Sequence, residues 1–143
     1  MSYQFYNLLH ILGIVLVFMA LGALAFHGAN GGDKQSNKVR GMVMGTHGVG
    51  LLLLVVAGFG MLAKTGAMAS GLPGWLHPKL LVWVLLGAAP VVVSRKPSAG
   101  KLVWFAVPLL AATAAYFGIN HSGAGAPAPA DTKSDTKSDT KSE

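Results

Sequence analysis

Hydrophobic positions along the chain gather into four long runs, and short polar segments separate the runs. They cover residues 8–26, 42–63, 75–93 and 102–119. Each run has close to the roughly 20 residues that a helix needs to cross the hydrocarbon core of a bilayer. Because backbone groups find no water to bond with in lipid, each run is predicted to be a helix. The sequence therefore predicts an all-α integral membrane protein, in which residues 1–121 form a four-helix bundle.

The two ends of the chain carry different signals. Residues 122–143 are rich in alanine and proline and then repeat DTKS three times. The alternating Asp and Lys nearly cancel and nothing there can build a packed core, so we expect a disordered tail with no chemistry. Residues 8–26 have no basic segment before them and are longer than the apolar core of a signal peptide. They are expected to be a retained helix.

The distribution of basic residues predicts how the four helices are oriented in the membrane. The chain of 143 residues has a formal net charge of +6. Six of its basic residues lie in or beside the first and third connections between runs: Lys34, Lys38, Arg40, Arg95, Lys96 and Lys101. Only Lys64 and Lys79 lie around the second. The positive-inside rule then predicts a multi-pass protein of the bacterial inner (plasma) membrane with both termini outside.

Composition excludes several classes of function. The chain has no cysteine, which rules out disulfides, iron–sulfur clusters and thiolate metal sites. The basic residues are spread over loops and come with no aromatic or helical readout pattern, so no nucleic-acid partner is expected. The expected partners are the lipid bilayer and either a second copy of the chain or a larger membrane complex.

The histidines fall at two depths if the helices alternate in direction. His10 and His77 lie near the outer ends of their runs, with His121 just beyond the fourth run, while His27 and His47 lie toward the inner side. Ionisable residues within membrane helices are costly and usually functional. At the edges an imidazole reaches headgroups and water cheaply, so His27 and His121 are interpreted as interface residues. For His10 and His47 a functional and a structural role remain equally open.

Facing imidazoles suit some ligands better than others. Copper and zinc accept imidazole, but a tight site usually needs three or four ligands, and no Asp or Glu occurs in any run. A haem needs only one or two axial ligands, which histidines on different helices can supply. Lys79 or Arg40, near a membrane interface, could then meet a propionate. Taken alone, Trp75 and Lys79 are also ordinary interface residues at a helix start.

Glycines in the second run suggest a helix-packing seam. Gly41 and Gly45 have the small-xxx-small spacing that lets membrane helices approach closely, and Ala111 and Ala115 repeat that spacing in the fourth run. A glycine-rich helix could also leave room for a flat cofactor. Helix packing alone is the more common explanation.

Two short motifs resemble a known group of proteins. NLLHIL in the first run and GWLHPKLLVW at the start of the third resemble small four-helix membrane proteins of the HemJ-like protoporphyrinogen oxidase, SirB and CopD grouping. The residues that fall on the HemJ-type pattern are His10, Trp75, Leu76, Lys79 and Leu80. The resemblance implies a haem b site and, for an enzyme, a membrane oxidoreductase that oxidises a porphyrinogen.

The sequence is therefore compatible with two functions. The first is a haem-b-binding redox protein with His10 and His77 as iron ligands and Lys79 and His47 as further cofactor-binding residues; His47 could share a second level with His27. The second is a non-catalytic polytopic membrane protein, or a subunit of a larger complex, whose histidines are structural. Whether the chain is an enzyme is left open.

Overall fold

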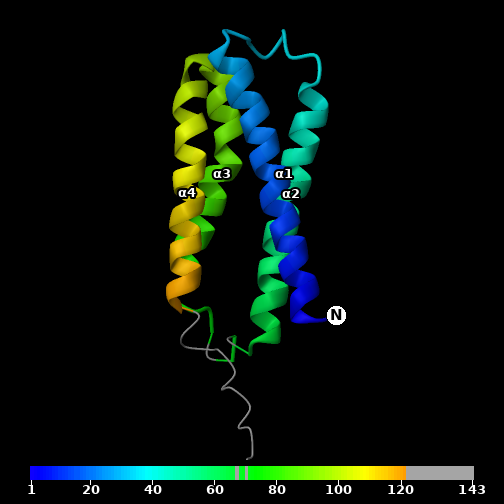
Figure 1. Cartoon of the computed structure of the whole chain (residues 1–143), viewed down its shortest axis with the longest axis vertical. Helices are drawn as coiled ribbons and strands as arrows, with labels where there is room; N and C mark the ends of the chain where they lie inside the picture. Colours follow the sequence, from blue (N-terminus) through cyan, green and yellow to red (C-terminus); the bar gives the residue numbers. More distant parts are fainter. Residues whose placement is uncertain (67, 70, 122–143) are drawn as a thin grey trace, which may run out of the picture.

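The computed structural model describes residues 1–66, 68–69 and 71–121. The predicted tail, residues 122–143, lies outside the described residues, as does the side chain of His121. Within the described part the chain forms four long α-helices and one short 3-10 turn: α1 (Tyr3–Ala29), α2 (Arg40–Lys64), α3 (Leu76–Arg95), η1 (Pro97–Ala99) and α4 (Gly100–His121). The all-α prediction is confirmed (Figure 1).

All four helices in this part of the chain are long and apolar enough to cross a membrane. Their outer surfaces expose large apolar side chains, among them Leu8, Phe26 and Met42. Such faces would be unfavourable against water over so wide an area but suit contact with lipid. The four helices are therefore those of an integral membrane protein.

The first helix is longer than its apolar run predicts. It begins at Tyr3 rather than at residue 8 because Ser2 caps it: the Ser2 hydroxyl accepts a hydrogen bond from the Phe5 amide at 3.3 Å. At its other end the side-chain amide of Asn30 donates to the Phe26 carbonyl at 2.8 Å. Gly31 follows with φ at 78°, a left-handed conformation that only glycine adopts without strain. These local signals lie outside the apolar run itself.

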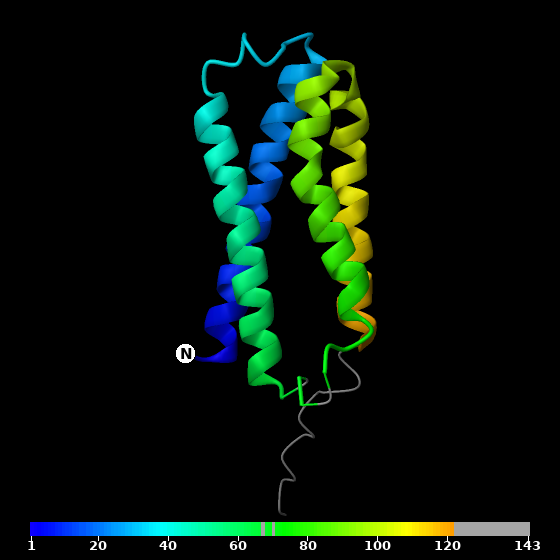
Figure 2. The same cartoon turned by 180° about the vertical axis from the view of Figure 1, so that it is seen from behind.

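Successive helices run antiparallel (Figures 1 and 2). The connections 30–39 and Pro97–Ala99 lie at one end of the bundle, here called the loop end. The chain start and the α2–α3 connection lie at the other, here called the N-terminal end. Helix α1 packs most extensively on α2 and also contacts α3 and α4, whereas α2 and α3 touch each other only sparsely.

The buried core gathers around α1, mainly in the half of the bundle nearer the loop end. Its members are small and branched aliphatic residues from all four helices of the described chain: Val17, Ala20, Leu21, Leu24, Ala25, Val43, Val82, Leu86, Ala89, Val93, Val103 and Val107. Pro90 is also fully buried, and α3 continues through it. Helix α1 is thus the element that holds the others in place.

The close seam between α1 and α2 involves Gly13 and Gly50. A Cβ built on Gly13 would lie 2.9 Å from the Gly50 carbonyl oxygen, and one built on Gly50 would lie 2.8 Å from Cγ2 of Val17. Cβ atoms built on Gly41 or Gly45 meet nothing within 4 Å in the described chain. The predicted Gly41–Gly45 seam is therefore wrong within this bundle. Gly41 precedes Gly50 by two and a half helical turns and so lies on the opposite face of α2.

Candidate functional site

His10 lies on α1 and its half-buried ring packs against α2. Its Nδ1 is 3.1 Å from the Leu54 carbonyl oxygen. A Cβ built on Gly58 would be 3.7 Å from Cε1 of the ring, so this glycine leaves room beside it. Because a carbonyl only accepts hydrogen bonds, the proton is assigned to Nδ1. Nε2 then carries the lone pair.

His77 lies in the first turn of α3 and is exposed. Its Nδ1 is 3.1 Å from the carbonyl oxygen of Gly74, three residues earlier. The same reasoning assigns the proton to Nδ1 and the lone pair to Nε2. His10 and His77 thus share one tautomer, and both lie toward the N-terminal end (Figure 1).

Lys79 connects this region to the fourth helix. Its Nζ lies 4.9 Å from the centre of the Trp75 ring, in cation–π range, and a Cβ built on Gly118 of α4 would be 3.2 Å from it. Lys79 is also close enough to His10 to interact with it electrostatically. Two residues along a helix turn by about 200°, so Lys79 and His77 lie on opposite faces of α3.

The N-terminal end therefore brings together His10 of α1, Leu54 and Gly58 of α2, and Lys79 of α3 with Gly118 of α4. His77 lies at the same end, but on the other face of α3 from Lys79, and its pairing with His10 stays a prediction. Sequence reasoning missed Leu54, Gly58 and Gly118. A backbone carbonyl leaves no signal in a sequence, whereas two glycines in apolar helices were a signal that could have been used.

His47 of α2 is the one buried polar residue in the core of the described chain, with only 3% of its surface exposed. It lies seven residues after the start of α2, roughly 10 Å along the helix. Its ring lies close to the backbone of Leu86 on α3, while Nε2 has no partner among the described residues. Beside it, Nε1 of Trp83 donates to the Leu51 carbonyl at 3.1 Å. Polar contacts thus link α2 and α3 where their packing is sparse.

His27 organises the loop after α1. Its Nε2 donates to the backbone carbonyl of Asp33 at 2.9 Å and lies 3.3 Å from the Ser36 hydroxyl. Oδ1 of Asp33 accepts from the backbone amides of Ser36 at 2.8 Å and Gln35 at 3.1 Å. The hydrogen bond from the Ser36 amide is the main reason that the pKa of the Asp33 carboxyl is lowered. His27 therefore has a structural partner of its own in the loop.

Ligand sets for other metals are not assembled. Within the described ranges, no three His, Asp or Glu side chains come close enough together to hold a metal ion. A tight zinc or copper site built from this chain alone would need such a group. A haem iron takes only one or two axial ligands from the protein, so it does not require such a group.

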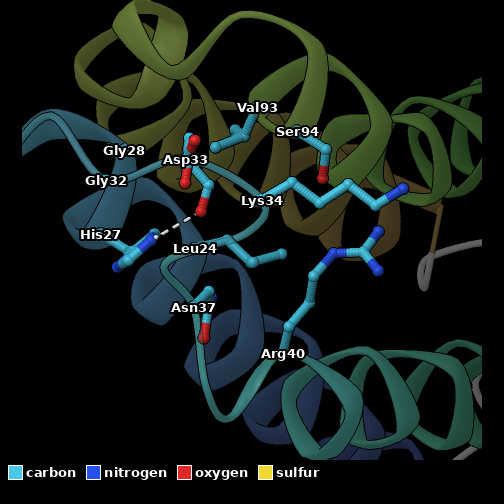
Figure 3. Close-up of a pocket in the computed structure, with 10 residues that line it drawn as sticks. All are labelled: Leu24, His27, Gly28, Gly32, Asp33, Lys34, Asn37, Arg40, Val93 and Ser94. Atoms are coloured by element: carbon cyan, nitrogen blue, oxygen red, sulfur yellow. Dashed lines mark hydrogen bonds between the residues drawn. The ribbon is translucent and has the colours of Figure 1, made fainter.

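A small cavity, here called the loop-end pocket, lies between the end of α1, the 30–39 loop and the last turns of α3 (Figure 3). Its volume is about 20 Å³, enough for about one water molecule. The lining residues are Leu24, His27, Gly28, Gly32, Asp33, Lys34, Asn37, Arg40, Val93 and Ser94.

Comparisons with protein-family models, with curated proteins and with solved structures find no match for this chain.

Proposed function

We propose that this integral membrane protein binds haem b at the N-terminal end of its bundle and acts in oxidation–reduction. His10 and His77 would ligate the iron. The observation that supports this is their common tautomer: each turns Nδ1 toward a backbone carbonyl at 3.1 Å. Metal-ligating histidines usually donate the second ring N–H to such a group, which fixes the ring and leaves Nε2 as the ligand.

The surroundings of His10 fit a macrocycle in three respects. Gly58 puts no side chain against the ring, and an added Cβ would be in ordinary van der Waals contact with its Cε1 at 3.7 Å. The neighbouring walls are apolar helix surfaces. Lys79 places a cation near His10, where it could pair with a propionate. A bound haem b would supply one-electron transfer, while the chain would orient its ligands and exclude water.

If the activity is enzymatic, the motif resemblance favours a membrane oxidoreductase of the porphyrinogen-oxidase type. His47 is the candidate for a second level of cofactor binding, because its buried Nε2 has no partner in the described chain. The bacterial inner membrane, with the loop end toward the cytoplasm, is the setting that the loop charges favour.

A second candidate is a non-catalytic membrane protein, or a subunit of a complex, with structural histidines. One observation favours it: the His10–Leu54 bond resembles the Trp83–Leu51 bond, and both tie a neighbouring helix to a carbonyl of α2. Polar groups often join membrane helices in this way without any cofactor.

Reduced-minus-oxidised absorption spectra test the choice. Full-length protein expressed with ample haem is expected to show a Soret band and sharp reduced α and β bands. His10→Ala and His77→Ala should each abolish the six-coordinate low-spin spectrum, because one axial imidazole is lost. His47→Ala should lower the haem-to-protein ratio but keep the spectral signal of the site formed by His10 and His77. His121→Ala is the matched control and should keep the wild-type spectrum.

Haem-free wild-type protein would overturn the redox proposal in favour of the structural candidate. In that case His10→Ala should still lower stability in detergent, by about 0.5–1.5 kcal/mol, since the Leu54 carbonyl loses a partner. A spectrum that survives in both His10→Ala and His77→Ala would also contradict the assigned ligands.

A further inference from the structure

The loop-end pocket has two cations on one side. Lys34 comes from the 30–39 loop and Arg40 from the first position of α2, and Ser94 of α3 also lines the pocket. Figure 3 shows the Lys34 and Arg40 side chains extending in the same direction, on the side of the pocket where Ser94 lies. Two like charges aimed at one place repel each other unless an anion lies between them.

Arg40 is incompletely satisfied. Its Nε is buried and has no hydrogen-bond partner among the described residues. A guanidinium stays charged at any physiological pH, so Arg40 cannot lose a proton to make the burial of this donor less unfavourable. A buried donor without an acceptor is unfavourable, and an oxygen from a ligand would relieve that cost.

Asp33, the acidic residue that lines the pocket, does not supply this oxygen acceptor. Oδ1 of Asp33 accepts hydrogen bonds from the backbone amides of Gln35 and Ser36, within its own turn. In Figure 3 Asp33 lies nearer to His27 than to the charged ends of Lys34 and Arg40. Its backbone carbonyl accepts the hydrogen bond from His27. The positive side of the pocket is thus left without a carboxylate of its own.

The missing group should carry negative charge and several oxygen acceptors. Phosphate meets both needs: a guanidinium pairs with it through two parallel hydrogen bonds, an ammonium neutralises it as a point charge, and a hydroxyl such as that of Ser94 can donate to it. The start of α2 adds a favourable field through the helix dipole: the N-cap Val39 makes no side-chain cap, although the Arg40 amide is bonded to the preceding loop, to the Asn37 carbonyl at 3.2 Å.

Size and position favour a lipid over a soluble phosphate compound. The pocket holds about 20 Å³, too little to enclose a ligand, so a phosphate would rest at its mouth. The mouth lies at a membrane end of the helices, between the start of α2 and the last turn of α3. Nearby outer surfaces are apolar: Val39, next to Arg40, is 54% exposed, and Val91, about one turn before Ser94 on α3, is 50% exposed. These faces suit acyl chains, and basic pockets between membrane helices commonly take anionic headgroups.

We propose that Lys34, Arg40 and Ser94 form a binding site for the phosphate of an anionic phospholipid at the loop end. The site does not involve the histidines of the proposed haem site, and it stands or falls independently of haem binding.

Native mass spectrometry of detergent-purified, delipidated full-length protein, titrated with phosphatidylglycerol, tests this site. Lys34→Gln and Arg40→Gln should each weaken binding about fivefold, the effect expected for one cation near a lipid headgroup. Arg40→Lys should also bind more weakly than the wild type, since it keeps the charge but loses the planar fork. The matched controls are Lys38→Gln and Arg95→Gln, exposed cations of the same end that do not line the pocket. Each should stay within twofold of the wild type.

Three results would overturn the proposal. Equal losses in the pocket variants and the controls would mean general attraction to a basic surface. Equal binding of phosphatidylcholine would remove the need for an anionic headgroup. Inorganic phosphate that stabilises the protein against heat as well as phosphatidylglycerol does would point to a soluble anion. If Arg40→Gln does not fold, Lys34→Gln and Ser94→Ala, which remove the other two contacts, decide the question by the same titration.

Discussion

Three polar side chains of the described chain bond to backbone carbonyls of a neighbouring segment. Nδ1 of His10 and Nε1 of Trp83 both donate to carbonyls of α2, and Nε2 of His27 donates to the carbonyl of Asp33. A helical carbonyl has a second lone pair, so it can accept such a bond without giving up the helix. The His10 and Trp83 donors are thereby satisfied within the bundle, where water is scarce.

His27 is expected to hold the 30–39 loop against the end of α1. Replacing it with alanine removes the bond to the Asp33 carbonyl and the contact with Ser36. We expect faster amide exchange across the loop and a loss of about 0.5–1.5 kcal/mol of stability. Hydrogen-exchange mass spectrometry in detergent measures the first effect and thermal unfolding the second. His77→Ala serves as the control, because His77 lies at the opposite end, and unchanged loop exchange in His27→Ala would refute this role.

Helix pairing depends on which face of each helix carries its small residues. Gly13 and Gly50 meet where α1 and α2 approach most closely, while Gly41 and Gly45 face away from the described bundle. Without a hydrophobic driving force in lipid, such close packing supplies much of the association energy. The α1–α2 pair is thus the most extensive helix contact of the described chain, and it is sensitive to added volume at Gly13 and Gly50.

Gly13→Ala should destabilise the protein by about 1–3 kcal/mol, because the new methyl would meet backbone atoms that cannot move aside cheaply. The nearest are the Gly50 carbonyl oxygen at 2.9 Å and the Leu54 amide nitrogen at 3.0 Å. Gly45→Ala is the control and should leave stability unchanged or slightly higher, since its Cβ meets nothing within 4 Å of the described chain. Thermal unfolding followed by circular dichroism compares the two. A larger loss in Gly45→Ala would place a packing partner on that face instead.

At the scale of the whole molecule, the antiparallel order collects the basic loops at one end. Lys34, Lys38 and Arg40 lie there with Arg95, Lys96 and Lys101. The opposite end has Lys64 and Lys79, and Lys79 is partly buried beside Trp75. This asymmetry underlies both the orientation and the lipid site proposed above.

The orientation can be tested by cysteine labelling in this cysteine-free chain. Ser98 lies exposed in η1 at the loop end, and Ala69 lies exposed in the α2–α3 connection. We expect an impermeant thiol reagent to label Ala69→Cys in intact cells and Ser98→Cys only after lysis, because positive loops stay in the cytoplasm. Labelling of both positions in lysed cells is the control for reactivity. The reverse pattern in intact cells would invert the topology.

The sequence by itself determined the number, order and alternating direction of the helices in the described chain. Apolar runs of membrane length can satisfy their backbone groups only as helices, and short connections leave successive helices antiparallel. His10 and His77 are accordingly placed toward one end, and His27 and His47 toward the other. The extra turn of α1 escaped prediction because Ser2 and the aromatic residues after it lie outside the apolar run.

Only the tertiary structure decided which face of each helix meets which neighbour. It selected Gly50 over Gly41, turned Lys79 toward α4 and left His77 exposed, and assigned His10 to the carbonyl of Leu54. Two physical reasons explain why these contacts could not be predicted from the sequence. Lipid accepts apolar side chains as readily as the bundle interior does, so hydrophobicity does not mark the inner face. Every residue also carries the same backbone carbonyl, so an acceptor such as Leu54 is recognised only once the fold has brought its donor within reach.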